Sequence, residues 1–111
     1  MRINVSARHF RASANLKDFA RDEVMRLKKY YDGIIDCELV FDKQREIRSC
    51  EIAIKVYGTI LNASVSSDDH FKSVVGAVDK LERQLRKYKA KLKNQRYSRG
   101  EELLERGVGI V

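Results

Sequence analysis

The sequence predicts an α+β fold: a two-layer sandwich of order β-α-β-β-β-α, with both helices on one face of a four-stranded sheet. Three observations lead to it. Four short segments alternate apolar and polar residues, as half-buried strands do. Two longer segments repeat apolar residues at steps of three and four, as amphipathic helices do. The alternating segments share one apolar face, which both helices should cover. A chain of 111 residues is enough for one such domain.

The first strand and helix occupy the N-terminal third of the chain. Residues 2–8 alternate, with Ile3, Val5 and Ala7 on the apolar side. Ser13 then precedes a helical pattern and is a plausible N-cap. The apolar face of this helix consists of Leu16, Phe19, Ala20, Val24, Leu27 and Tyr31. We expect Gly33 to end the helix in a left-handed turn, a conformation that glycine accepts.

The next two strands determine each other's register. Their apolar residues face one core only if the strands pair Phe41 with Cys50, Leu39 with Ile52, and Cys37 with Ile54. The two cysteines then lie four residues apart along the sheet, about 13 Å at ~3.3 Å per residue. A disulfide needs Cα atoms within ~7 Å. We therefore expect two buried free thiols.

A second hairpin should bring the fourth strand beside the third. Gly58-Thr59 fits a two-residue loop with glycine first, the type II′ preference. This loop predicts the pairs Val56–Leu61, Ile54–Ala63 and Ile52–Val65. The opposite face of the sheet should then show solvent the polar side chains Glu38, Asp42, Glu51, Lys55, Asn62 and Ser64.

A second, longer helix is predicted over about residues 69–94. Ser67, Asp68 and Asp69 supply candidate caps at its start. Its apolar stripe consists of Phe71, Val74, Val75, Val78, Leu81, Leu85, Tyr88 and Leu92. Its last turns should project beyond the sheet, because a strand of about six residues spans only ~20 Å. We expect the domain to comprise residues 1–97, and the glycine-containing residues 98–111 to form a tail or linker.

The positive charge of the chain is concentrated on this second helix. Between Lys80 and Arg99 there are nine basic residues and one acid, Glu82, a net charge of +8. The whole chain carries +7, which leaves −1 for the rest. The basic residues are Lys80, Arg83, Arg86, Lys87, Lys89, Lys91, Lys93, Arg96 and Arg99. Like charges on one helix repel, and a focused positive surface attracts polyanions. Nucleic acid is the first partner to test; a solvated face, an acidic protein and a membrane surface are the alternatives.

Other chemistry finds little support in the sequence. His9 and His70 are far apart, and no glycine-rich phosphate loop or metal-ligand spacing occurs. We expect no enzyme activity, cofactor, metal or small-molecule substrate. No apolar run approaches the ~20 residues that cross a bilayer, and no signal peptide is evident, so we expect a cytoplasmic protein without a membrane partner. Tyr57 and Tyr97 are interpreted as ordinary surface residues, which leaves little for base stacking.

Residues 63–93, ASVSSDDHFKSVVGAVDKLERQLRKYKAKLK, closely resemble the ribosome hibernation-promoting and ribosome-associated inhibitor family (protein Y). The most specific part is DKLERQLRKYKAKLK, from Asp79 to Lys93. The segment Leu27-Lys28-Lys29-Tyr30-Tyr31-Asp32 and the start of the chain are also similar, so that the resemblance covers about residues 1–95. His70 stands where relatives have methionine, and we attach no function to it.

The resemblance implies a fold related in shape to double-stranded RNA-binding domains. It also implies binding to the small ribosomal subunit and its ribosomal RNA, over the tRNA and mRNA sites, which would block translation and preserve idle ribosomes. The family's basic positions correspond to Lys28, Lys80, Arg83, Lys87 and Lys91, and Lys89 and Lys93 match the hibernation-promoting branch. With Arg86 from the charge pattern, these are the predicted RNA-binding residues.

Two functional alternatives stay open beside this interpretation. One is a general double-stranded RNA-binding module, and the other is an adaptor for an acidic protein. Long family members add a dimerisation domain, which 111 residues do not include. A short family form that is monomeric away from the ribosome is therefore expected, with a fragment of a long form as the alternative.

Overall fold

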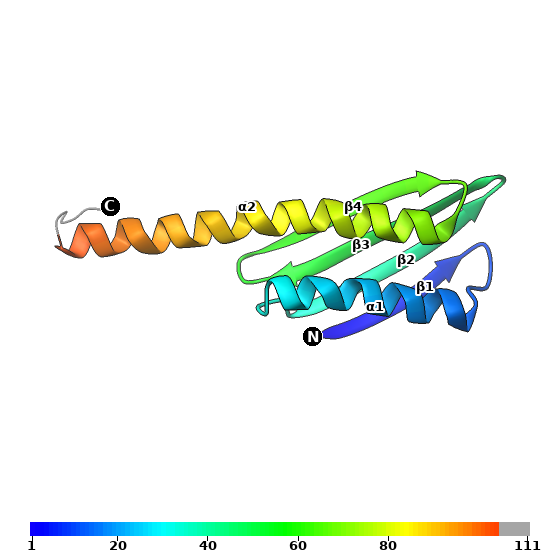
Figure 1. Cartoon of the computed structure of the whole chain (residues 1–111), viewed down its shortest axis with the longest axis horizontal. Coiled ribbons are helices and arrows are strands. Elements are labelled where there is room, and N and C mark those ends of the chain that lie inside the picture. Colours follow the sequence, from blue (N-terminus) through cyan, green and yellow to red (C-terminus); the bar gives the residue numbers. More distant parts are fainter. Residues whose placement is uncertain (105–111) are drawn as a thin grey trace.

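The computed structural model describes the backbone of residues 1–104 and the side chains of residues 1–93, and it confirms the predicted order of elements (Figure 1). The elements are β1 (Arg2–Arg8), α1 (Ala14–Tyr30), β2 (Asp36–Gln44), β3 (Ile47–Val56), β4 (Thr59–Ser67) and α2 (His70–Leu104). The side chains of Arg96, Tyr97 and Arg99, and all of residues 105–111, lie outside this description.

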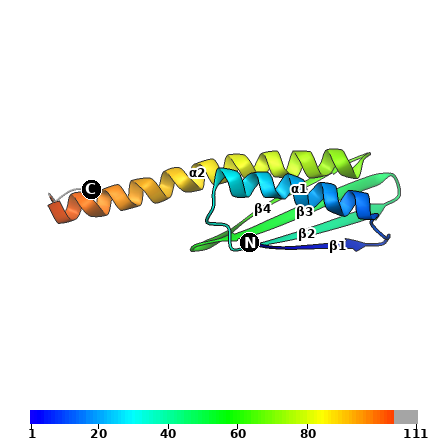
Figure 2. The ribbon, with the colours of Figure 1, turned by 60° about the horizontal axis from the view of Figure 1, so that its bottom comes forward.

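The four strands form one sheet in the order β1-β2-β3-β4. β1 runs parallel to β2, because α1 carries the chain back across the sheet between them, while the other neighbours are antiparallel. Both helices lie on the same face, as Figure 2 shows, which confirms the predicted two-layer sandwich. The largest fully buried side chains come from both layers: Phe41, Leu27, Leu39, Ile52, Ile54, Leu81, Leu85, Val24, Val56, Val74 and Val78.

The register predicted for β2 and β3 is confirmed. Phe41 lies opposite Cys50, Leu39 opposite Ile52, and Cys37 opposite Ile54. Both cysteines are buried free thiols, as expected. The register held because a shift by one residue would have turned Glu51 into the core.

The register predicted for β3 and β4 is wrong by two residues. The loop is Tyr57-Gly58, and the structure pairs Val56 with Thr59, Ile54 with Leu61, and Ile52 with Ala63. Gly58 occupies the second loop position, where its φ of +86° suits a residue without Cβ. A slip of two preserves the alternation, so the apolar pattern cannot distinguish these two registers.

The start of α1 agrees with the prediction, but its end does not. The Ser13 hydroxyl accepts a hydrogen bond from the Leu16 backbone N–H (3.1 Å) and caps the helix. At the other end, Tyr31 adopts an extended conformation, and its N–H donates to the carbonyl of Leu27. Gly33 does not take the expected left-handed turn. It is needed because a Cβ there would lie 2.6 Å from the Tyr31 ring.

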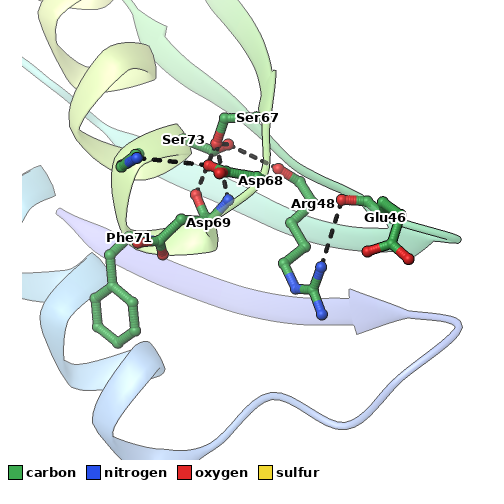
Figure 3. Close-up of polar contacts among 8 residues, drawn as sticks. Glu46, Arg48, Ser67, Asp68, Asp69, Phe71 and Ser73 are labelled. Atoms are coloured by element: carbon green, nitrogen blue, oxygen red, sulfur yellow. Dashed lines mark hydrogen bonds and ion pairs between the residues drawn. The ribbon is translucent and has the colours of Figure 1, made fainter.

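The first turn of α2 is tied to the sheet by side-chain hydrogen bonds (Figure 3). The Asp69 carboxylate accepts from the Phe71 N–H (2.8 Å), so Asp69 is the N-cap among the three candidates. Ser73 donates its hydroxyl to the carbonyl of Arg48 on β3 (2.7 Å) and also bonds the Ser67 hydroxyl. These contacts set the direction in which the helix leaves the sheet.

Two features of α2 differ from the prediction. Phe71 and Val75 are exposed rather than part of the core stripe, and Phe71 packs edge-on against Phe19 of α1 at 5.0 Å. The helix also continues to Leu104 instead of ending near residue 94. No proline interrupts it, and a single glycine, Gly100, costs only ~1 kcal/mol relative to alanine. α2 thus projects past the sheet (Figure 1).

The outer face of the sheet is polar, as predicted. Glu38, Glu51, Lys55, Asn62 and Ser64 are exposed, and Asp42 is half-buried. This face is free of helices (Figure 2).

Candidate nucleic-acid interface

The predicted RNA-binding residues divide into two flanks of α2. Lys80, Lys87 and Lys91 form the β4 flank, and Arg86, Lys89 and Lys93 form the α1 flank. All six are exposed. By helical spacing, Arg83 lies on the solvent side between the flanks and is also exposed. Lys28 is half-buried in the last turn of α1.

The β4 flank is held by a row of hydrogen bonds to the neighbouring strand and its hairpin loop. Side chains at successive turns of α2 donate to backbone carbonyls: Lys80 Nζ to Ser64 (3.3 Å), Gln84 Nε2 to Asn62 (2.7 Å), and the Tyr88 hydroxyl to Tyr57. β4 is an edge strand, so its outward carbonyls would otherwise be open to solvent or to another strand. Lys80 therefore has a structural contact that the charge pattern did not reveal. An ammonium has three donors, so Lys80 can still contact a phosphate.

The α1 flank is organised by Tyr30, the last residue of α1. Arg86 Nε donates to the Tyr30 hydroxyl (3.1 Å), and Lys89 Nζ donates to the Tyr30 carbonyl (3.2 Å). The Lys89 ammonium also lies 4.7 Å from the centroid of the same ring, within cation–π range. The hydrogen bond to Tyr30 raises the pKa of Arg86 above its usual value. Tyr30 was absent from the predicted site, because no sequence pattern places the end of α1 beside residue 86.

The cations of both flanks are largely left without carboxylate partners. Among the described side chains, Arg86 alone of the eight predicted residues forms an ion pair, with Glu82 at 3.3 Å. That pair is exposed, and pairs of this kind contribute little to stability. Contacts to carbonyls and to an aromatic ring orient the other side chains without cancelling their charge. The interface therefore presents uncompensated positive charge to the solvent.

The two histidines have contacts within the fold. His70 is buried, stacks on Phe10 at 4.6 Å, and donates from Nε2 to the carbonyl of Asp42 (2.9 Å). His9 Nδ1 contacts the Asp42 carboxylate (2.7 Å), and this hydrogen bond lowers the pKa of Asp42. The part of the chain that the structure describes has no group of three or more potential metal ligands, and no helix in it is long and apolar enough to cross a membrane.

Residues 3–93 match the model of a family described as "Sigma 54 modulation protein / S30EA ribosomal protein". The chain is similar to the ribosome hibernation promoting factor of Escherichia coli strain K12, with 28% identity over 93 residues, 84% of this chain and 98% of the relative. It is also similar to the factor of the same name from Pseudomonas putida KT2440, with 24% identity over 91 residues, 82% of this chain and 89% of the relative.

Two solved structures resemble the fold. A ribosomal subunit interface protein from Coxiella burnetii superposes with a TM-score of 0.77 and 29% identity, covering 81% of this chain and 99% of that one. The N-terminal domain of Thermus thermophilus Protein Y gives a TM-score of 0.74 over 79% of this chain and 99% of that one. At 22% identity, the second similarity supports the fold alone.

Proposed function

The chain belongs to the sigma 54 modulation protein / S30EA ribosomal protein family, and from that premise we propose that it is a non-enzymatic ribosome hibernation factor. Relatives that align over most of their own length carry the name ribosome hibernation promoting factor, and a structural relative is named a ribosomal subunit interface protein. Nothing in the described residues points to the sigma-factor role that the family description also mentions.

The proposed mechanism is occlusion. The two flanks of α2, with Arg83 and Lys28, would contact the phosphate backbone of small-subunit ribosomal RNA in the channel used by tRNA and mRNA. A helix that contacts phosphates and ribose hydroxyls recognises RNA by shape more than by sequence. Filling the channel would block translation without any chemical step.

The observation that supports this proposal is the uncompensated charge of the interface. The protein tolerates repulsion between exposed cations on successive turns of α2, and the contacts it makes to them leave their charge intact. Such repulsion lowers helix stability unless a ligand supplies negative charge. A polyanion with regularly spaced charges meets this need.

A charge reversal tests the proposal. The variant Lys87→Glu/Lys91→Glu should lose co-sedimentation with purified small subunits and keep the circular dichroism spectrum of the wild type. Its matched control, Lys55→Glu/Lys72→Glu, makes the same change in net charge at exposed sites on β3 and on the first turn of α2. The control should still bind. Equal binding by both variants would refute a role for the β4 flank.

Competition distinguishes the two alternatives. A free RNA duplex should displace a general double-stranded RNA-binding module from small subunits, but it should have little effect on a ligand shaped for the ribosomal channel. Nuclease treatment should leave a complex with an acidic protein intact and should disrupt one held by RNA. As further parts of the proposal, the ribosome-binding domain ends at about residue 97, and the protein is cytoplasmic and monomeric away from the ribosome.

A further inference from the structure

A groove opens beside the β4 flank, between α2 and the tip of the β3–β4 hairpin. It has a volume of about 650 Å³. Tyr57, Leu61 and Leu92 contribute aromatic and apolar surface, while Lys87 and Lys91 add positive charge. Figure 2 shows α2 passing over the hairpin tip, which places the groove where the helix leaves the sheet.

Tyr57 is the unusual member of this groove. It lies at the tip of the hairpin with 80% of its surface exposed, the highest value among the exposed large hydrophobic residues of the described chain. Its backbone carbonyl is held by the Tyr88 hydroxyl, so the loop is anchored although the ring is open to solvent. The adjacent Gly58 adds no side chain, and a Cβ there would meet nothing within 4 Å. An aromatic face is thus presented at an unobstructed position.

The chemistry of the groove restricts its occupant. Lys87 and Lys91 lie one helical turn apart, and such residues are separated by ~5–6 Å between Cβ atoms, near the spacing of phosphates along a nucleic-acid strand. An apolar peptide would leave both ammonium groups without partners. In double-stranded RNA the bases are stacked on each other, whereas unpaired bases can stack on exposed aromatic rings.

We infer that this groove holds an unpaired RNA nucleotide, its base against the Tyr57 ring and its flanking phosphates at Lys87 and Lys91. The inference rests on the proposed function, since the RNA would be that of the small subunit. It adds a contact with a base to an interface that otherwise recognises only the phosphate backbone. It also gives Tyr57 a role different from that of an ordinary surface residue.

Substitutions at Tyr57 separate base stacking from apolar docking. Tyr57→Phe keeps the aromatic face, while Tyr57→Leu keeps apolar surface but removes the ring. Ile60→Ala is the matched control, because Ile60 is an exposed apolar residue on β4 that does not line the groove. All three changes affect exposed side chains and leave the carbonyl that Tyr88 contacts, so circular dichroism and melting temperature should match the wild type.

Affinity for purified small subunits is measured first. Tyr57→Leu should weaken binding by ~5- to 150-fold, the range for loss of one stacked base. Tyr57→Phe and Ile60→Ala should bind like the wild type. Dimethyl sulfate probing of the ribosomal RNA is the second measurement. Wild type and Tyr57→Phe should protect a base that Tyr57→Leu leaves reactive, while the rest of the protected region stays the same.

The outcomes distinguish this inference from the proposed function. If the wild type binds small subunits and Tyr57→Leu binds equally well with the same protected bases, the nucleotide site is refuted and the proposed function stands. If Tyr57→Leu weakens binding but uncovers no base, the groove holds a protein segment instead, and the inference is wrong. If the wild type does not bind small subunits at all, both fall.

Discussion

Replacing Lys87 and Lys91 with glutamine should reduce both the affinity of ribosome binding and its dependence on salt. Both side chains are exposed on the β4 flank, and neither forms an ion pair with another side chain in residues 1–93. Glutamine has a helix propensity close to that of lysine, so the substitution removes charge and leaves α2 helical. If the lysines contact phosphates, each displaces condensed counterions when the complex forms.

The size of this effect follows from counterion release. Each phosphate contact contributes about −0.9 to the slope of log affinity against log salt concentration. Removing two contacts should make that slope less steep by ~1.8. Between about 0.1 and 0.3 M salt, the wild type should therefore lose ~7-fold more affinity than the variant does.

The assay is titration of labelled protein with small subunits at several salt concentrations. Lys55→Gln/Lys72→Gln serves as the control, because it removes the same charge away from both flanks of α2. The control should keep the slope of the wild type. A Lys87→Gln/Lys91→Gln variant with the slope of the wild type would show that these lysines do not contact phosphate, whatever its affinity.

Three further predictions concern the fold and the α1 flank. Burial raises the pKa of Cys37 and of Cys50 from the usual 9.0 to about 12, so at pH 8 a disulfide reagent should label neither thiol until the protein is unfolded in guanidinium. Because these pKa values are raised, the neutral thiols stabilise the fold fully below pH 9, and the free energy of unfolding should fall as the pH rises toward 12; a Cys37→Ala/Cys50→Ala variant with the same alkaline decline would contradict this cause. Tyr30→Phe removes the acceptor of Arg86 but keeps the ring beside Lys89, so it should weaken small-subunit binding less than Tyr30→Ala, and equal effects would show that the ring does not position Lys89. Asp69→Ala removes the N-cap of α2 and should cost about 1 kcal/mol in chemical denaturation, whereas an unchanged midpoint would mean that water replaces the cap.

The two hairpins show where prediction from the sequence succeeded and where it failed. For β2 and β3, an error of one residue would have buried Glu51, so the pattern allowed a single answer. For β3 and β4, an error of two residues kept every apolar side chain on the core face. The deciding factor was the backbone of the loop, where Gly58 takes the second position with positive φ. Side-chain patterning has period two and carries no information about a shift of two.

The candidate site shows a similar division. The eight predicted cations could be chosen from charge and resemblance, and the structure places seven of them exposed on α2. Tyr30, Gln84 and the groove at Tyr57 were not predicted, because each depends on contacts between segments far apart in the chain. Gln84 lies four residues from both Lys80 and Tyr88, and this spacing was the one available signal.

The sequence by itself determined the order of the elements, the two-layer architecture, the first hairpin and the location of the positive charge. These follow from local periodicity and composition, which are properties of neighbouring residues. Only the tertiary structure decided which carbonyls Lys80 contacts, how Tyr30 orients Arg86 and Lys89, and that a groove opens at Tyr57. The physical reason is that such contacts depend on how far α2 extends over β4 and the end of α1, and that geometry is set by packing across the whole core.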